Sequence, residues 1–161
     1  MIKEIFKKTT ISKESIDSVL DYVNPSERRV ISAEITNRTI LGIVRCFSPT
    51  YTKKTVEYIS SSEVMISLAQ ISHIFIDELV RQPYFEFKYD LTQEKLKILR
   101  DNHEIYFTNM SLVFNDKVPQ SNYELKVELI GYKKFLSLFA AKFNFNIDTK
   151  IYGSFTAGMT V

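Results

Sequence analysis

One segment, residues 60–82, constrains the fold more than any other part of the chain. Its sequence, SSSEVMISLAQISHIFIDELVRQ, predicts one long helix that is apolar around most of its circumference. The serines at its start can cap a helix, and Glu63 lies in the first turn, where the helix dipole favours a carboxylate. Arg81 and Pro83 mark its end. The broad apolar side comprises Val64, Met65, Leu68, Ala69, Ile71, Phe75, Ile76, Leu79 and Val80. Other elements must therefore wrap this helix.

Most of the remaining chain has the pattern of β-strands that could provide this covering. Alternating, β-branched segments at 29–36 and 39–47 predict a hairpin that turns near Asn37. After an amphipathic helix at 91–102, four long strand-like segments follow. They occupy residues 104–114, 122–132, 135–147 and 150–161, with turns at Asp116-Lys117, around Lys133-Lys134 and at Asp148-Thr149. Sequential strands with short turns favour an antiparallel meander.

The order of elements, two strands, one long helix and then several antiparallel strands, is that of an α+β hot-dog fold, in which a curved antiparallel sheet wraps around one long central helix. A chain of 161 residues has the length of one domain. We therefore expect a single hot-dog domain over residues 1–161. Short helices predicted at 2–8 and 13–23 would make residues 1–28 an N-terminal helical extension.

Composition excludes several classes of function. Lys and Arg together number 21 and Asp and Glu 19, so the net charge of +2 gives no reason to expect a nucleic-acid partner. Cys46 is the only cysteine and there are two histidines, so we expect no disulfide, no metal and no cofactor. The start of the chain does not resemble a signal peptide, and no apolar stretch reaches about 20 residues. We expect a cytoplasmic protein with no membrane span.

A polar stripe interrupts the apolar surface of the long helix. It consists of Ser60, Glu63, Ser67, Gln70, His73 and Asp77. Glu63 and Gln70 are seven residues apart, so they lie almost in line, two turns apart. The stripe has two interpretations. It is either the solvated or dimer-facing edge of an amphipathic helix, or one wall of a cleft for an acyl thioester, since a buried carboxylate needs a partner or a function.

The second interpretation assigns chemistry to this stripe. Glu63 would activate a water as general base, and Gln70 would position the water or the thioester. The N–H groups near Ser61 and Ser62 would form an oxyanion site. The acyl chain would lie beside Met65, Ile66 and Ser67. Cys46, at the end of an apolar strand with no histidine nearby in sequence, is better interpreted as a small core residue than as a nucleophile.

The segment SPTYTKKTVEYISSSEVMISLAQ resembles the FcoT-like long-chain acyl-CoA thioesterases. In that family a Pro-x-Tyr precedes a loop, and a Glu and a Gln stand seven apart on the helix. Here these residues are Pro49, Tyr51, Glu63 and Gln70. The later run FLSLFAAKFNFNIDTKIYGSFTAG is similar to the last two strands of the family, and the resemblance covers about residues 29–160.

This resemblance implies a hot-dog fold assembled as a homodimer or higher homo-oligomer, with acyl sites near subunit interfaces. It also implies that Tyr51 and Ser60 orient the thioester. The sequence departs from the family at two asparagines, which are replaced by Ser60 and Ala69. A serine can still donate a hydrogen bond, whereas an alanine cannot.

The leading hypothesis is a hydrolase of fatty acyl-CoA or acyl-carrier-protein thioesters. The resemblance also implies an alternative, a lyase that adds glycine to an enoyl thioester, because members of the FcoT-like family occur in pathways that make isonitrile lipopeptides. A dehydratase is another, although His73 lies about three turns from Glu63, too far to share one reacting atom unless a second subunit brings it closer. The third hypothesis is a non-catalytic acyl-binding module.

Overall fold

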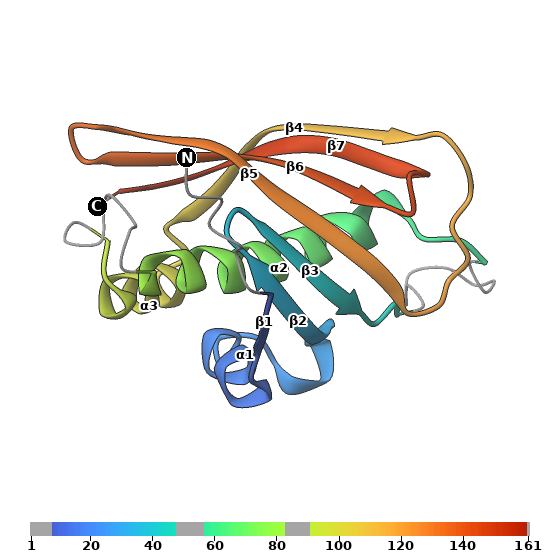
Figure 1. The fold of residues 1–161 in the computed structure, drawn as a ribbon, viewed down its shortest axis with the longest axis horizontal. Helices are drawn as coiled ribbons and strands as arrows, with labels where there is room; N and C mark the ends of the chain where they lie inside the picture. Colours follow the sequence, from blue (N-terminus) through green and yellow to red (C-terminus); the bar gives the residue numbers. More distant parts are fainter. Residues whose placement is uncertain (1–7, 48–56, 83–90, 161) are drawn as a thin grey trace.

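The computed structural model describes residues 8–47, 57–82 and 91–160 as a seven-stranded antiparallel sheet with one long helix against it (Figure 1). The strands are β1 (Thr9–Ile11), β2 (Val30–Thr36), β3 (Thr39–Val44), β4 (Ile105–Phe114), β5 (Tyr123–Phe135), β6 (Leu138–Ile147) and β7 (Ile151–Thr160). The helices are α1 (Lys13–Val19), the 3₁₀ helix η1 (Pro25–Glu27), α2 (Ser61–Arg81) and α3 (Gln93–Asp101). The helix expected at 2–8 lies almost wholly outside the described residues. This arrangement agrees with the predicted α+β class.

The predicted long helix is confirmed as α2, which runs along one face of the sheet (Figure 1). Ser60 caps its start, since its side chain accepts a hydrogen bond from the backbone N–H of Glu63 at 3.3 Å. Gly42 of β3 allows α2 to approach the sheet closely, because a Cβ there would lie 2.2 Å from the side chain of Ile71. None of the helices within the described ranges is long and apolar enough to cross a membrane.

The sheet order is β1-β2-β3-β5-β6-β7-β4, which corrects the predicted four-strand meander. Only β5, β6 and β7 follow one another. β4 pairs with β7 instead of β5, because β3 occupies the free side of β5 with a register that joins Val44 to Tyr123. Residues 115–122 therefore connect β4 to β5 around one end of the sheet (Figure 1).

The two hairpin turns of the meander differ in how well they were predicted. The turn at Asp148-Thr149 is confirmed, and both residues have positive φ, 47° and 58°, as a tight hairpin turn requires. The turn predicted at Lys133-Lys134 is wrong, because β5 continues to Phe135 and pairs with Leu138. The turn lies at residues 136–137 instead, with Leu136 at φ 54°. A left-handed conformation costs a residue with a Cβ about 1–2 kcal/mol.

The N-terminal segment is only partly helical. β1 adds a short strand beside β2, with Ile11 opposite Ala33. α1 then begins after Ser12, whose side chain accepts from the Ser15 N–H at 3.1 Å, and ends at Val19 instead of residue 23. Ile16 is buried, so α1 contributes to the same core as α2.

Candidate active site at the start of the central helix

The polar stripe of α2 is buried, so its interpretation as a solvated edge is wrong. Glu63, Ser67, Gln70, His73 and Asp77 are all at most 8% exposed. The segment from α1 to the start of β2 lies against this side of the helix and supplies hydrogen-bond partners to it. The solvent-facing side of α2 instead carries Met65 and Ile66, which are 50% and 43% exposed.

Glu63 forms a buried ion pair with Arg29, which immediately precedes β2. The Arg29 Nη1 donates to the Glu63 Oε1 at 2.9 Å, and the backbone N–H of Phe47 reaches the same oxygen at 3.4 Å. The Arg29 guanidinium also lies 4.3 Å from the centre of the Phe47 ring, within cation–π range. The end of β3 and the start of β2 thus bring a cation and an aromatic ring to the first turn of α2.

Burial raises the pKa of the Glu63 carboxyl above its ordinary value, and the charge of Arg29 opposes that rise. The adjacent thiol of Cys46 has its pKa raised to about 11, first by burial and then by the Glu63 charge. Cys46 is therefore a thiol near neutral pH, which agrees with its interpretation as a packing residue. Glu63 is the group in this cluster whose pKa is moved toward neutrality, as a general base requires.

Gln70 does not face an open cleft, because both ends of its amide bind backbone. Its Oε1 accepts from the Arg29 N–H at 2.7 Å and its Nε2 donates to the Glu27 carbonyl at 3.0 Å. Glu63 and Gln70 therefore hold the same segment, 27–29, from two successive places on one side of α2. Their seven-residue spacing serves to fix Arg29 beside Glu63.

The other predicted site residues on α2 differ in how far they are buried. Ser60 is the N-cap, and Ser61 and Ser62 lie exposed in the first turn. Ser67 is buried and accepts a hydrogen bond from the Tyr123 hydroxyl at 2.6 Å, so it packs against β5. Tyr51 lies outside the described residues.

The second half of the stripe forms a separate buried network. Asp77 accepts from Arg81 at 2.9 Å and from Arg100 at 3.3 Å, and so ties α3 to α2. The Tyr22 hydroxyl hydrogen-bonds to the Nδ1 of His73, and burial lowers the His73 pKa to about 3. His73 is therefore neutral. It lies about 15 Å along the helix from Glu63, at a rise of 1.5 Å per residue.

Sequence reasoning missed Arg29, Phe47 and Gln120 as neighbours of Glu63. Gln120 follows β4 and donates to the Phe47 carbonyl at 3.0 Å, closing the cluster from the C-terminal half of the chain. The sequence offered one signal for Arg29, namely its position directly before an apolar strand. A cation at such a position can be buried if it pairs with a buried carboxylate elsewhere in the chain.

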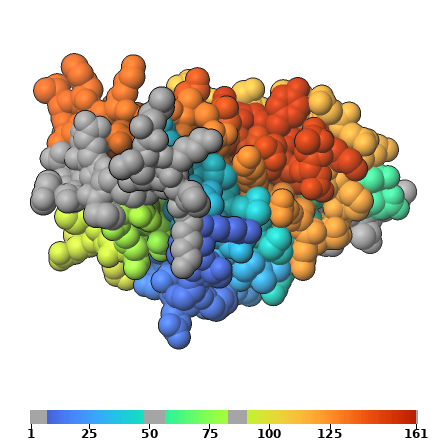
Figure 2. Space-filling view, in the orientation of Figure 1, coloured from blue at the N-terminus to red at the C-terminus, as the bar shows by residue number. Residues whose placement is uncertain are grey.

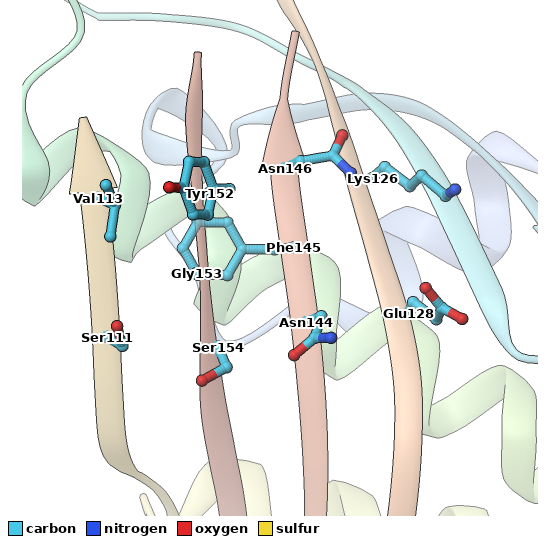
Figure 3. A pocket seen from close by; sticks show the side chains of 10 residues that line it. All are labelled: Ser111, Val113, Lys126, Glu128, Asn144, Phe145, Asn146, Tyr152, Gly153 and Ser154. Carbon is cyan, nitrogen blue, oxygen red and sulfur yellow. The ribbon is translucent and has the colours of Figure 1, made fainter. Parts of the chain in front are cut away.

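A hollow lies on the face of the sheet opposite α2, and none of the predicted site residues line it. It has a volume of about 410 Å³ and crosses β4, β7, β6 and β5. Tyr152, Asn146, Asn144, Ser154, Lys126 and Glu128 point into it (Figure 3). Its lining mixes polar side chains with Val113 and Phe145 and is open to solvent, whereas the cluster around Glu63 is buried.

Searches with the sequence found no matching protein-family model and no curated relative. The structure is similar to the dehydratase domain of RzxB from Pseudomonas fluorescens, with a TM-score of 0.52 and 9% identity over 94% of this chain. The chain spans only 48% of that structure's length. It is also similar to Cj0977, a sigma28-regulated virulence protein from Campylobacter jejuni, with a TM-score of 0.53 and 11% identity over 99% of this chain and 96% of that one.

At these identities the likeness concerns the fold alone. An antiparallel sheet with a long helix packed against it, together with these neighbours, is consistent with the hot-dog fold. Within this class of fold the more specific resemblance to FcoT-like thioesterases stays a prediction.

Proposed function

We propose that this protein is an acyl-thioester hydrolase with Glu63 as its general base, as the sequence resemblance implied. The observation that carries the proposal is the Glu63 carboxylate itself. It is buried at the start of the central helix, its pKa is raised, and Arg29 holds it at 2.9 Å. A buried carboxylate with a raised pKa and a fixed partner is typical of a functional site.

In the proposed reaction Glu63 takes a proton from a water molecule, and the resulting hydroxide attacks the thioester carbonyl carbon. The tetrahedral intermediate collapses by breaking the carbon–sulfur bond. The products are a carboxylic acid and a thiol, which takes up the proton. The first-turn N–H groups of α2, at Ser61 and Ser62, are not needed for bonds within the helix and can stabilise the oxyanion.

Other residues would orient the reactants. Ser60 and Tyr51 would orient the thioester, as the resemblance implies, and the exposed Met65 and Ile66 would contact the acyl chain. Gln70 acts as a positioning residue, since its amide binds the backbone on both sides of Arg28. A fatty acyl-CoA or acyl-carrier-protein thioester is the substrate.

A second copy of the chain would complete the sheet at β4. The outer edge of β4 has no strand partner within the described ranges. Its inward side chains Ile105, Phe107, Met110 and Leu112 are only partly buried. An unpaired edge of ten residues is a template for pairing with another strand, so we infer a homodimer or higher homo-oligomer. A monomer by light scattering at micromolar concentration would contradict this inference.

The proposal is tested by incubating the protein with short-, medium- and long-chain acyl-CoA and acyl-carrier-protein thioesters and measuring free thiol. Glu63→Gln should lower kcat by about 10²–10⁴-fold. The kcat of the parent should rise with pH through the raised pKa of Glu63, because the base must be ionised. Glu14→Gln is the matched control, since Glu14 also lies in the first turn of a helix and is exposed. No thiol release from any substrate would refute hydrolysis.

A non-catalytic acyl-binding module is the second candidate. It is favoured because the side chains of Glu63 and Gln70 are already bonded to other groups of the protein. Glu63 is ion-paired and the Gln70 amide is used at both ends. Acyl-CoA binding without turnover, unchanged by Glu63→Gln, would establish this function. The same assay with added glycine, followed by mass spectrometry, tests the lyase. A dehydratase within one subunit lacks support, because His73 is buried and far from Glu63.

A further inference from the structure

The turn between β5 and β6 places large apolar side chains in solvent. Phe135 is 74% exposed and Leu136 is 81% exposed. Leu138 and Ile130, on the two strands behind the turn, are 49% and 44% exposed. We call Ile130, Phe135, Leu136 and Leu138 the apolar tip. It forms one end of the sheet, at the upper left of Figures 1 and 2.

Leu136 is a poor choice for folding at this position. Its φ of 54° is in the left-handed region, where a two-residue hairpin turn favours asparagine, aspartate or glycine. A leucine there is strained and also leaves its side chain in water. Folding alone would favour a small polar residue, so the apolar side chain has another use.

The charges of the hairpin from Leu129 to Lys142 have one sign, and the first carboxylate behind the turn on β5 is Glu128, seven residues before Phe135. Residues 129–142 contain Lys133, Lys134 and Lys142 and no carboxylate. Lys133 and Lys142 are exposed and lie on the same face of the hairpin as Phe135 and Leu138, as the pairing register shows. Between them is a mainly apolar hollow of about 320 Å³, lined in part by Ile130 and Ala140. A partner that complements this face combines negatively charged groups with an apolar region.

We propose that the apolar tip inserts into the surface of a bilayer that contains anionic lipids. Lys133 lies two residues behind Phe135, which is roughly 7 Å along a strand. Interfacial elements bury their apolar side chains about 5–10 Å into the boundary between headgroups and acyl chains. Phe135 and Leu136 would therefore enter the acyl region while Lys133 meets the lipid phosphates. Lys142 pairs with Gly131, about 14 Å behind Phe135, and would add attraction to the anionic surface from further away. This function is independent of the chemistry proposed for Glu63, which lies at the other end of α2 (Figure 1).

The chain has no tryptophan, which gives a clean optical test. Phe135→Trp places a single reporter in the apolar tip, and its emission should shift to shorter wavelength on mixing with phosphatidylglycerol–phosphatidylcholine vesicles. The shift should be absent with phosphatidylcholine alone. Tyr152→Trp on β7, where the parent side chain is 41% exposed and pairs with Asn146 at the far end of the sheet, is the matched control and should not respond. Equal responses at both positions, or none at Phe135→Trp, would overturn the proposal.

Two further variants separate membrane binding from folding. Leu136→Asn suits the left-handed turn, so it should raise the melting temperature while it lowers vesicle cosedimentation by about tenfold or more. The double variant Lys133→Glu/Lys142→Glu should lower binding to anionic vesicles by at least tenfold and leave the melting temperature nearly unchanged. Wild-type cosedimentation of Leu136→Asn would refute the proposal. Loss of self-association in Leu136→Asn, with no vesicle binding by the parent, would assign the tip to a second copy of the chain instead.

Discussion

Removing one partner of the Glu63–Arg29 pair should destabilise the protein far more than removing both. The side chains of Glu63 and Arg29 are each 7% exposed, and the Arg29 Nε has no hydrogen-bond partner among the described residues. Glu63→Ala leaves the buried Arg29 guanidinium with only the exposed Glu27 carboxylate, 4.0 Å away, and loss of a buried partner costs about 3–5 kcal/mol. In a domain of this length, each kcal/mol lowers the melting temperature by about 2–4 °C, so the midpoint should fall by roughly 6–20 °C.

The double variant Glu63→Met/Arg29→Met should recover most of this loss. Replacing a buried ion pair by apolar side chains of similar volume is often neutral or stabilising, so we expect its free energy of unfolding to lie within about 1 kcal/mol of the parent. Urea unfolding of the parent, both single variants and the double variant measures the coupling energy. Single variants within about 1 kcal/mol of the parent would show that the pair is not buried in solution.

The same double variant separates chemistry from folding. If Glu63 is the general base, a folded Glu63→Met/Arg29→Met protein should release no thiol from any acyl thioester. Turnover at the parent rate would place the base elsewhere and leave Glu63 with a structural role only.

Three other changes have defined outcomes. Because burial lowers the His73 pKa from 6.5 to about 3, stability should fall as the pH drops below 6.5, by roughly 2 kcal/mol at pH 5, and urea unfolding of His73→Phe should lose this contribution. Asp77→Ala should lower the free energy of unfolding by about 3–5 kcal/mol in thermal unfolding, because it leaves the buried Arg100 guanidinium of α3 without its carboxylate. Arg81→Ala removes a side chain that is 41% exposed and should cost about 1 kcal/mol or less. Gly153→Ala should lower the melting temperature sharply, since its Cβ would lie 1.9 Å from a backbone oxygen of β4, whereas Gly131→Ala has no atom within 4 Å and should change it little.

The spacing of apolar residues was sufficient to predict helices and strands whose buried face can be recognised within the element itself. The helix at 60–82 and the strands on either side of it follow from apolar spacing, and the structure places them within a few residues. The position of β4 was not predictable in this way, because a strand pattern specifies which face is buried and not which strand lies beside it. The turn at Leu136 was missed because it lacks the glycine or asparagine that marks such turns.

The candidate site was predicted in part. Glu63 and Gln70 were identified from their spacing, but the partners that define their environment are distant in sequence or are backbone groups. Arg29 comes from the N-terminal segment, and the groups bound by Gln70 are the Arg29 N–H and the Glu27 carbonyl. No side-chain pattern encodes backbone partners, so the positioning role of Gln70 could only come from the structure.

The pairing of β3 with β5 has a consequence for how the chain folds. It is the only ladder that joins the N-terminal strands to the C-terminal strands within the described ranges, and α2, α3 and β4 all lie between its two strands in sequence. Closing so long a loop carries an entropic cost before any contact is gained, and such non-local pairing slows folding. The β2–β3 hairpin and the β5–β6–β7 meander can each form locally, so we expect the β3–β5 ladder to form late and to limit the folding rate.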